Sequence, residues 1–352
     1  MSNRSNSCFL LLLLSIACNG EKRQDTPQFQ SLPVPRIVGV QRPAADSMHK
    51  PTTRAALVWR IGGLFDDTLL VQPERALITS TDILVTDHAT ARVLAFKLSD
   101  GTVRWISQWL AKKATSLIFI GSNAGQHFLL ERSARKLVTL GDRGNVLAEE
   151  TLPGRYVPAN ACVHKQGIYF AIPGRPYRLG EYRNVVSQLT EAESRDSPLG
   201  YTDTKSPRSS QFEVSYSSSH CVFFGPQSSK VVVTTTEDHR KLSSGTENGD
   251  DSQIIELFLP HQNAQSLTGQ PNAFPTSAAV AGDKLLLLYG GIPNFEQRRV
   301  DVYSMTTGEY CCAFSVGQRP RVIAGRGSFV AVIGEAENGS FDLSLYELKK
   351  DR

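Results

Sequence analysis

The sequence predicts an all-β protein built from repeated four-stranded units. Short apolar runs recur about every forty to fifty residues, and most are followed by a polar corner and a second apolar run. Gly, Asp and Asn occupy the corners, as is typical of tight turns. No long amphipathic helical pattern lies between the runs. Strands repeated at such a period are typical of a propeller or a β-solenoid.

Residues 83–105 show the unit, because they contain two apolar strands around a polar corner, then a turn and a third strand. Six such units can be counted along the chain. Their inner strands are expected near residues 76–79, 117–120, 161–164, 221–224, 277–280 and 321–324. The second strands are expected near 83–85, 128–130, 168–171, 231–233, 285–289 and 329–333, and the third near 93–96, 137–140, 178–182, 254–259, 300–303 and 343–346.

The sixth unit lacks an outer strand of its own. Five units have a fourth strand, as at residues 103–106, whereas the printed sequence stops just after the third strand of the sixth. An unpaired outer edge is an aggregation liability. Residues 57–61 alternate apolar and mixed positions before the first unit and have no partner there. We therefore expect a six-bladed β-propeller of four-stranded antiparallel blades in residues 55–352, with the last blade closed by this N-terminal strand.

The repeats also carry family resemblances. The spacing of Asp87, Arg92, Val93 and Phe96 resembles the NHL-type repeat of six-bladed β-propellers. A second spacing is similar to a repeat of quinoprotein-type propellers. Together the resemblances cover about residues 55–348 and imply a propeller, but no activity, since the shared residues belong to strands and turns. The other NHL-like positions are Glu131, Lys136, Leu137, Leu140, Arg178, Leu179, Tyr182, Arg299, Val300 and Tyr303; the quinoprotein-like ones are Ala95, Gly101, Trp105, Val302, Gly308 and Cys312.

The N-terminus has the features of a signal peptide, expected over residues 1–17. Arg4 supplies positive charge, residues 9–14 form a short apolar core, and Ser15-Ile16-Ala17 places small residues where signal peptidases read. Cys18 follows directly, so LSIAC resembles the lipobox of bacterial lipoproteins, and we expect Cys18 to be lipidated. The lipobox usually has Leu in place of Ser15, and the same residues would serve ordinary secretion. A secreted protein is therefore the alternative.

Residues 18–54 are rich in Pro, Gln, Ser and charge, and are expected to form a flexible tether between a lipid anchor and the propeller. The anchor places the protein in the cell envelope, in the periplasm or at the cell surface. The formal net charge of +4 is small and the basic residues are scattered among acidic ones, so we expect no nucleic-acid partner. We expect a monomer.

The cysteines leave one question open. Cys162 and Cys221 are expected on inner strands of consecutive blades, where an oxidising compartment allows a disulfide. A bridge needs Cα atoms within about 7 Å, which parallel inner strands do not readily offer. Cys311 and Cys312 are expected to act as small hydrophobic residues. No CxxC or His-containing partner motif predicts a metal site, and no cofactor is expected.

Two long insertions predict a binding face. Residues 190–211 lie between the third and fourth blades, and residues 237–252 are expected between the second and third strands of the fourth blade. Because strands in a blade alternate in direction, both insertions should then rise from one face. Packed blades hold such loops in register, which favours binding. The alternative is that both segments are disordered decoration.

Corner residues between second and third strands are the candidate ligand-binding groups on that face. The hypothesis is a binding module for a protein, peptide or saccharide; the alternative is a cell-surface propeller hydrolase or lyase, although no convergent acid, base or metal-ligand set is evident. Ordinary solvated turns would give the same pattern. The candidates are His88, Arg175, His239, Asn294, Arg298 and Glu335.

Overall fold

The computed structural model is all-β in the residues that it describes, and these belong to the compact unit Ser31–Arg352. No helix in this part of the chain is long and apolar enough to cross a membrane. The described residues are 36–38, 55–62, 69–108, 116–153, 157–164, 167–172, 178–182, 186–188, 213–224, 230–235, 254–258, 275–289, 299–308, 310–317, 319–336 and 338–349.

The described strands form six sheets, which are antiparallel except for one parallel pairing at an outer edge and are consistent with the predicted blades. Blade 1 contains β3 (Pro73–Ile78), β4 (Asp82–Asp87), β5 (Arg92–Lys97) and β6 (Val103–Gln108). Blade 2 contains β7 (Leu117–Asn123), β8 (Gln126–Glu131), β9 (Lys136–Leu140) and β10 (Val146–Thr151). Blade 3 contains β11 (Asn160–His164), β12 (Gly167–Ile172), β13 (Arg178–Tyr182) and β14 (Val186–Gln188).

Blades 4 to 6 complete the set. Blade 4 contains β15 (Glu213–Ser217), β16 (His220–Phe224), β17 (Lys230–Thr235) and β18 (Ile254–Phe258). Blade 5 contains β19 (Ser277–Ala281), β20 (Lys284–Tyr289), β21 (Arg299–Ser304) and β22 (Tyr310–Ser315). Blade 6 contains β23 (Pro320–Arg326), β24 (Phe329–Glu335), β25 (Phe341–Leu348) and β2 (Ala55–Gly62).

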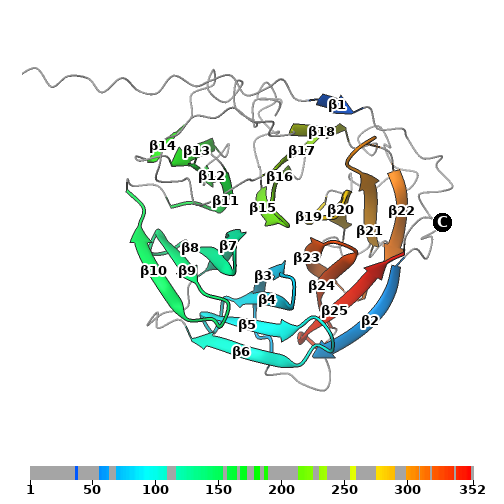
Figure 1. Ribbon diagram of the computed structural model, residues 1–352, viewed down its shortest axis with the longest axis horizontal. Helices are drawn as coiled ribbons and strands as arrows, with labels where there is room; N and C mark the ends of the chain where they lie inside the picture. Colours follow the sequence, from blue (N-terminus) through cyan, green and yellow to red (C-terminus); the bar gives the residue numbers. More distant parts are fainter. Residues whose placement is uncertain are drawn as a thin grey trace, which may run out of the picture. The chain divides into compact units, whose positions relative to one another are not determined.

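The blades are arranged in a closed ring. Each inner strand contacts the inner strands of the two neighbouring blades, in the cyclic order β3, β7, β11, β15, β19, β23 and back to β3. Figure 1 looks down this ring, with the inner strands around the centre and the outer strands at the rim. The hydrophobic clusters lie between blades: one joins blades 6 and 1, others join blades 4 and 5, 5 and 6, and 2 and 3.

The N-terminal strand closes the ring as predicted. β2 pairs antiparallel with β25, with Leu57 opposite Tyr346 and Ile61 opposite Leu343. In Figure 1 the blue β2 lies beside the red β25, so the last blade contains both early and late parts of the chain. Trp59 and Ile61 pack against the cluster between blades 6 and 1, whereas Leu57 is 50% exposed.

Blade 4 differs from the prediction by one strand. Residues 220–224 form the second strand, β16, and the inner strand is β15, which precedes it. β15 has the sequence EVSYS, in which only Val214 and Tyr216 are large and apolar. A short strand with so few apolar residues, next to a Ser-rich segment, is easily attributed to a loop. The predicted second and third strands of this blade are therefore its third and fourth.

This shift overturns the prediction that one face carries both insertions. Residues 190–211 and 237–252 lie outside the described residues, but the strands that flank them are described. The first connects the fourth strand of blade 3 to β15, whereas the second connects β17 to β18, the third and fourth strands of blade 4. In an antiparallel blade these two connections leave from opposite ends.

A disulfide joins blades 3 and 4. Cys162 and Cys221 are bonded with a Cα–Cα distance of 5.8 Å. The expected obstacle, two parallel inner strands, does not arise, because Cys221 lies on the second strand of its blade and only Cys162 lies on an inner strand. Cys311 and Cys312 pack in the cluster between blades 5 and 6, as small hydrophobic residues do.

One further strand lies within the segment expected to be a tether. β1 (Arg36–Val38) pairs parallel with β18 and adds a fifth strand to the outer edge of blade 4. The rest of residues 18–54 lies outside the described residues.

Candidate functional site

The two faces of the ring are defined by the direction of the inner strands. Near its start, β3 contacts Ser116, which immediately precedes β7, as well as the first residues of β11 and β15. The inner strands therefore begin together on one face, here called the entry face. Turns between second and third strands open on the same face. The opposite face, where the inner strands end, is called the exit face.

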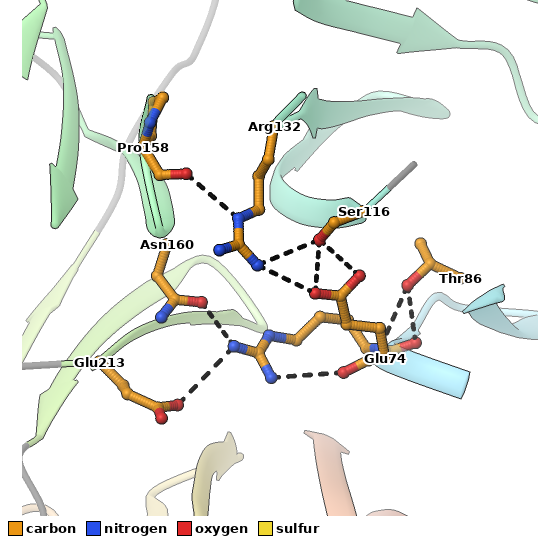
Figure 2. A network of polar contacts seen from close by, with 8 residues as sticks. Glu74, Thr86, Ser116, Arg132, Pro158, Asn160 and Glu213 are labelled. Atoms are coloured by element: carbon orange, nitrogen blue, oxygen red, sulfur yellow. Dashed lines mark hydrogen bonds and ion pairs between the residues drawn. The ribbon is translucent and has the colours of Figure 1, made fainter. Parts of the chain in front are cut away.

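Polar side chains from blades 1, 2 and 3 meet at the mouth of the ring on the entry face (Figure 2). The hydroxyl of Ser116 donates to the carboxylate of Glu74, with Oγ–Oε distances of 2.5 and 2.7 Å. Arg132, in the turn between β8 and β9, contributes Nη1, which lies 3.3 Å from Glu74 Oε1. Arg132 Nε donates to the carbonyl of Pro158 at 3.1 Å. This cluster ties three blades together.

Arg75 extends the network to the fourth blade. Its Nη2 donates to Asn160 Oδ1 at 2.5 Å and lies 3.7 Å from Glu213 Oε2. Asn160 and Glu213 are the first residues of β11 and β15, so one arginine of blade 1 reaches blades 3 and 4. The Arg75 side chain is 22% exposed and that of Glu213 is 44% exposed. The mouth therefore presents a fixed guanidinium beside a carboxylate that solvent and ligands can reach.

His88 lies where the sequence predicts, in the turn between β4 and β5 on the entry face. Its ring is half-buried, and Nδ1 has no hydrogen-bond partner in the described part of the chain. The preceding residue, Asp87, is buried and accepts hydrogen bonds from the backbone N–H groups of Val71 and Gln72. Its Oδ2 also lies 3.7 Å from Arg92 Nη2. These contacts hold the turn that carries His88.

Glu335 also lies on the entry face, at the last position of β24. It pairs with Arg321 of β23, whose guanidinium lies over the ring of Phe341 at 5.7 Å from the centroid. Within the described residues, no hydrogen bond or ion pair joins His88 or Glu335 to the Glu74 and Arg75 network. The structure therefore places these two residues on the predicted face, but not in that network.

The remaining predicted residues lie outside the described residues. Arg175 falls between β12 and β13, and Asn294 and Arg298 fall between β20 and β21, which are second-to-third-strand connections as predicted. His239 falls between β17 and β18, a third-to-fourth-strand connection, so its assignment to the shared face was wrong. The cause is the one-strand shift in blade 4. Cys18 is outside the described residues too.

The exit end of the ring is crossed by hydrogen bonds between blades. The Tyr216 hydroxyl of blade 4 donates to the carbonyl of Ser122 in blade 2 at 3.2 Å. The Ser217 hydroxyl accepts from the backbone N–H of Val280 at 3.0 Å and lies 3.4 Å from the carbonyl oxygen of Gly325. Burial raises the pKa of Tyr216. These contacts join inner strands of different blades at the exit end of the ring.

The mouth offers charged and hydrogen-bonding groups. Each carboxylate in the described network is paired with an arginine, and the Ser116 hydroxyl is engaged by Glu74. Among the described residues, no group of three or more His, Cys, Asp or Glu side chains could hold a metal ion. A guanidinium and a carboxylate at fixed positions can orient a ligand that carries complementary polar groups.

Sequence reasoning missed Glu74, Arg75, Ser116, Arg132 and Glu213. Arg132 lies in the corner between the second and third strands of blade 2, a corner that is not among the predicted ones. The other four stand at or just before the first residues of inner strands. The signal was a charged or hydroxyl residue immediately before an apolar inner strand, as in PERALI of β3.

Comparisons with known proteins support the fold. No protein-family model matches the sequence, and no curated protein matches it. A solved structure of a candidate exported protein from Bacteroides fragilis is 12% identical and has a TM-score of 0.50, covering 90% of this chain and 100% of that one. Virginiamycin B lyase from Staphylococcus aureus is 15% identical with a TM-score of 0.44, covering 84% and 99%. A regucalcin from Agrobacterium tumefaciens is 11% identical with a TM-score of 0.46, covering 81% and 94%.

Proposed function

We propose that this chain is an exported, lipid-anchored, monomeric β-propeller that binds a protein, peptide or saccharide at the mouth of its entry face. The observation that carries the proposal is the reach of Arg75 across the mouth to Asn160 and Glu213. Residues from separate blades thereby form one polar surface, and polar groups held at fixed positions can orient a ligand. Of the predicted corner residues, His88 and Glu335 are described and lie on this face, and the proposal includes Arg175, Asn294 and Arg298 as further ligand-binding residues.

Export and anchoring are supported by two features. The N-terminal residues resemble a signal peptide followed by a lipobox with Cys18 as the acylated residue. The Cys162–Cys221 disulfide fits a protein that folds outside the reducing cytosol. We also propose that the repeats are of the NHL type. In support, Asp87 and Arg92, which have the spacing of that repeat, form an ion pair at the corner of blade 1.

The rival function, a propeller hydrolase or lyase, requires a group that is poised to transfer a proton or attack a substrate. The pairing of Glu74 with Arg132 and of Glu213 with Arg75 holds these carboxylates in ion pairs instead. Ion-paired groups at a mouth suit recognition better than general acid–base chemistry.

The test is partner capture by variants of the two faces. Arg75→Gln and Glu213→Gln remove charge from the entry mouth without adding bulk, and Arg143→Gln is the matched control on an exposed exit-face turn. The full-length lipoprotein is used to capture partners from membranes of the native organism, and the captured partner is then titrated against each variant. We expect affinity to fall about tenfold or more in the two mouth variants and to be unchanged in the control.

Melting temperatures of all three variants are compared with wild type, so that loss of fold is not mistaken for loss of binding. Equal affinity in wild type and both mouth variants, or a loss confined to Arg143→Gln, would show that the entry mouth is not the binding site.

A further inference from the structure

A pocket on the exit face lies apart from the mouth described above. It has a volume of about 550 Å³, within the usual range for small-molecule sites. Its walls come from the two exit-face turns of blade 1, from β6, and from the first residue of β24 in blade 6. The lining residues are Ser80, Thr81, Asp82, Lys97, Leu98, Ser99, Arg104 and Phe329.

Arg104 is held in place at this pocket. Its Nη1 lies 2.6 Å from Asp82 Oδ2 and 3.3 Å from Thr81 Oγ1. Thr81 also donates to Asp82 Oδ2 at 2.6 Å. These contacts engage only Nη1, and the side chain is 43% exposed, so the rest of the guanidinium fork is available to a ligand.

The charge of the pocket suits a monoanion. Lys97 adds a second cation and makes no ion pair with a described carboxylate, whereas Asp82 is the one carboxylate in the lining. Two cations and one carboxylate leave a single net positive charge. A guanidinium fork can bind the two oxygens of a ligand carboxylate in a bidentate manner. A single net positive charge is balanced by one carboxylate, whereas a phosphate carries more negative charge than the lining can balance.

The rest of the pocket suits a hydroxylated ring. Leu98 and Phe329 supply apolar and aromatic surface, and Ser80 and Ser99 supply hydroxyl groups. The carbonyl of Leu98 accepts a hydrogen bond from Trp59 Nε1 at 2.9 Å, which fixes this wall to the closing strand.

We propose that this exit-face pocket binds an acidic monosaccharide, a pyranose ring bearing one carboxylate. The carboxylate lies between Arg104 and Lys97, the apolar side of the ring packs on Phe329 and Leu98, and the ring hydroxyls face Ser80 and Ser99. The pocket is a second site, independent of the partner that binds the entry mouth.

The test is calorimetric titration of the full-length protein with glucuronate. Glucose supplies the ring without the carboxylate, acetate supplies the carboxylate without the ring, and inorganic phosphate tests for a general anion site. Lys97→Gln removes one cation, and Arg104→Lys keeps the charge near Asp82 but removes the fork. Arg143→Gln, in the equivalent exit-face turn of blade 2, is the control.

We expect millimolar or tighter binding of glucuronate, at least tenfold weaker binding of the three other probes, and about tenfold weaker glucuronate binding in each pocket variant, with no change in Arg143→Gln. Glucuronate affinity that is equal in wild type and Lys97→Gln would overturn the proposal. So would phosphate or acetate binding as tightly as glucuronate, or an absence of heat at millimolar glucuronate. Because Lys97→Gln breaks no ion pair, its result does not depend on the stability of the Arg104 contact.

Discussion

Trp59 of the closing strand lies directly on Gly101 of the first blade. A Cβ atom added to Gly101 would stand 2.9 Å from Trp59 Cε3, and Gly101 has a φ of +74°. The indole Nε1 donates to the carbonyl of Leu98 in the same turn. The next blade repeats the arrangement, since Trp105 covers Gly144 and donates to the carbonyl of Asp142. A Trp side chain packed on a Gly therefore joins the closing strand to blade 1, and a second contact of the same kind joins blade 1 to blade 2.

Gly101→Ala should destabilise the protein by roughly 1–3 kcal/mol more than Gly327→Ala, because both alanines are strained by a positive φ but only the first overlaps an indole. No atom lies within 4 Å of a Cβ built on Gly327, which makes it the matched control. Urea unfolding measures the difference. Equal losses in the two variants would mean that the Trp59 contact is not tight.

Removal of the closing strand should open the ring. Deletion of residues 19–50 removes β1 and should leave a soluble propeller, whereas deletion of residues 19–62 removes β2 and exposes the edge of β25. The lost packing comes from Trp59 and Ile61, at roughly 1.5–3 kcal/mol for each side chain if fully buried. Light scattering and thermal melts measure the outcome. An equally stable monomer after the longer deletion would show that β2 is not needed to close the last blade.

Loss of the disulfide should cost up to about 4 kcal/mol, because the bridge closes a loop with a sequence separation of 59. Cys162→Ala with Cys221→Ala is compared with wild type in urea, each with and without a reducing agent. The reducing agent should shift only the wild type. Cys311→Ser, whose thiol is in no disulfide, is the control. A wild type that is insensitive to reduction would show that the bridge does not form.

Stability should fall as the pH drops from about 6.5 towards 4. Burial lowers the pKa of His127 to about 4, so the unfolded chain binds a proton in this range that the folded chain does not. His127 contributes its full stabilisation of the fold above its pKa in the unfolded chain, about 6.5, and this free energy of unfolding falls by about 2 kcal/mol between pH 7 and pH 5. His127→Asn should reduce this slope, measured by urea unfolding at both pH values.

Part of the slope should persist in that variant, because burial also lowers the pKa of His220. A slope that is unchanged by His127→Asn would mean that His127 titrates normally.

Lipidation of Cys18 should make the mature protein partition into detergent. Cys18→Ala should move it to the aqueous phase or leave it as an unprocessed precursor, as seen by phase separation in Triton X-114 followed by mobility on gels. A wild type found entirely in the aqueous phase would replace lipoprotein anchoring by simple secretion.

The fold was predictable where apolar periodicity is strong. The run LLLLY in β20 predicts a buried strand, and such runs predict the blades. The run LVWRI in β2 predicts a strand that has no local partner, and the cost of an open sheet edge then predicts that it closes the last blade. EVSYS in β15 gives no such signal. Its burial comes from neighbouring blades, a tertiary effect that no local window contains. That missed strand displaced the predictions for His239 and for Cys221.

The candidate site was predictable only in its face. Corner positions such as His88 follow from strand alternation, but the partners of Arg75 depend on which inner strands stand across the mouth. Asn160 and Glu213 are far from Arg75 in sequence and meet it only because the ring has six blades of this curvature. Contacts between the starts of inner strands from different blades leave no periodic pattern in the sequence.

The pairing of β2 with β25 also fixes the order in which the molecule can be completed. Synthesis runs from the N-terminus, so β2 is made before β3 to β25, whereas its partner β25 is the last of these strands to be made. Blades 1 to 5 can assemble from local hairpins in the meantime, but β2 waits with its hydrogen-bonding edge unsatisfied. A truncated or stalled chain therefore cannot hide this edge, and incomplete copies should be recognised by proteases while finished ones are spared.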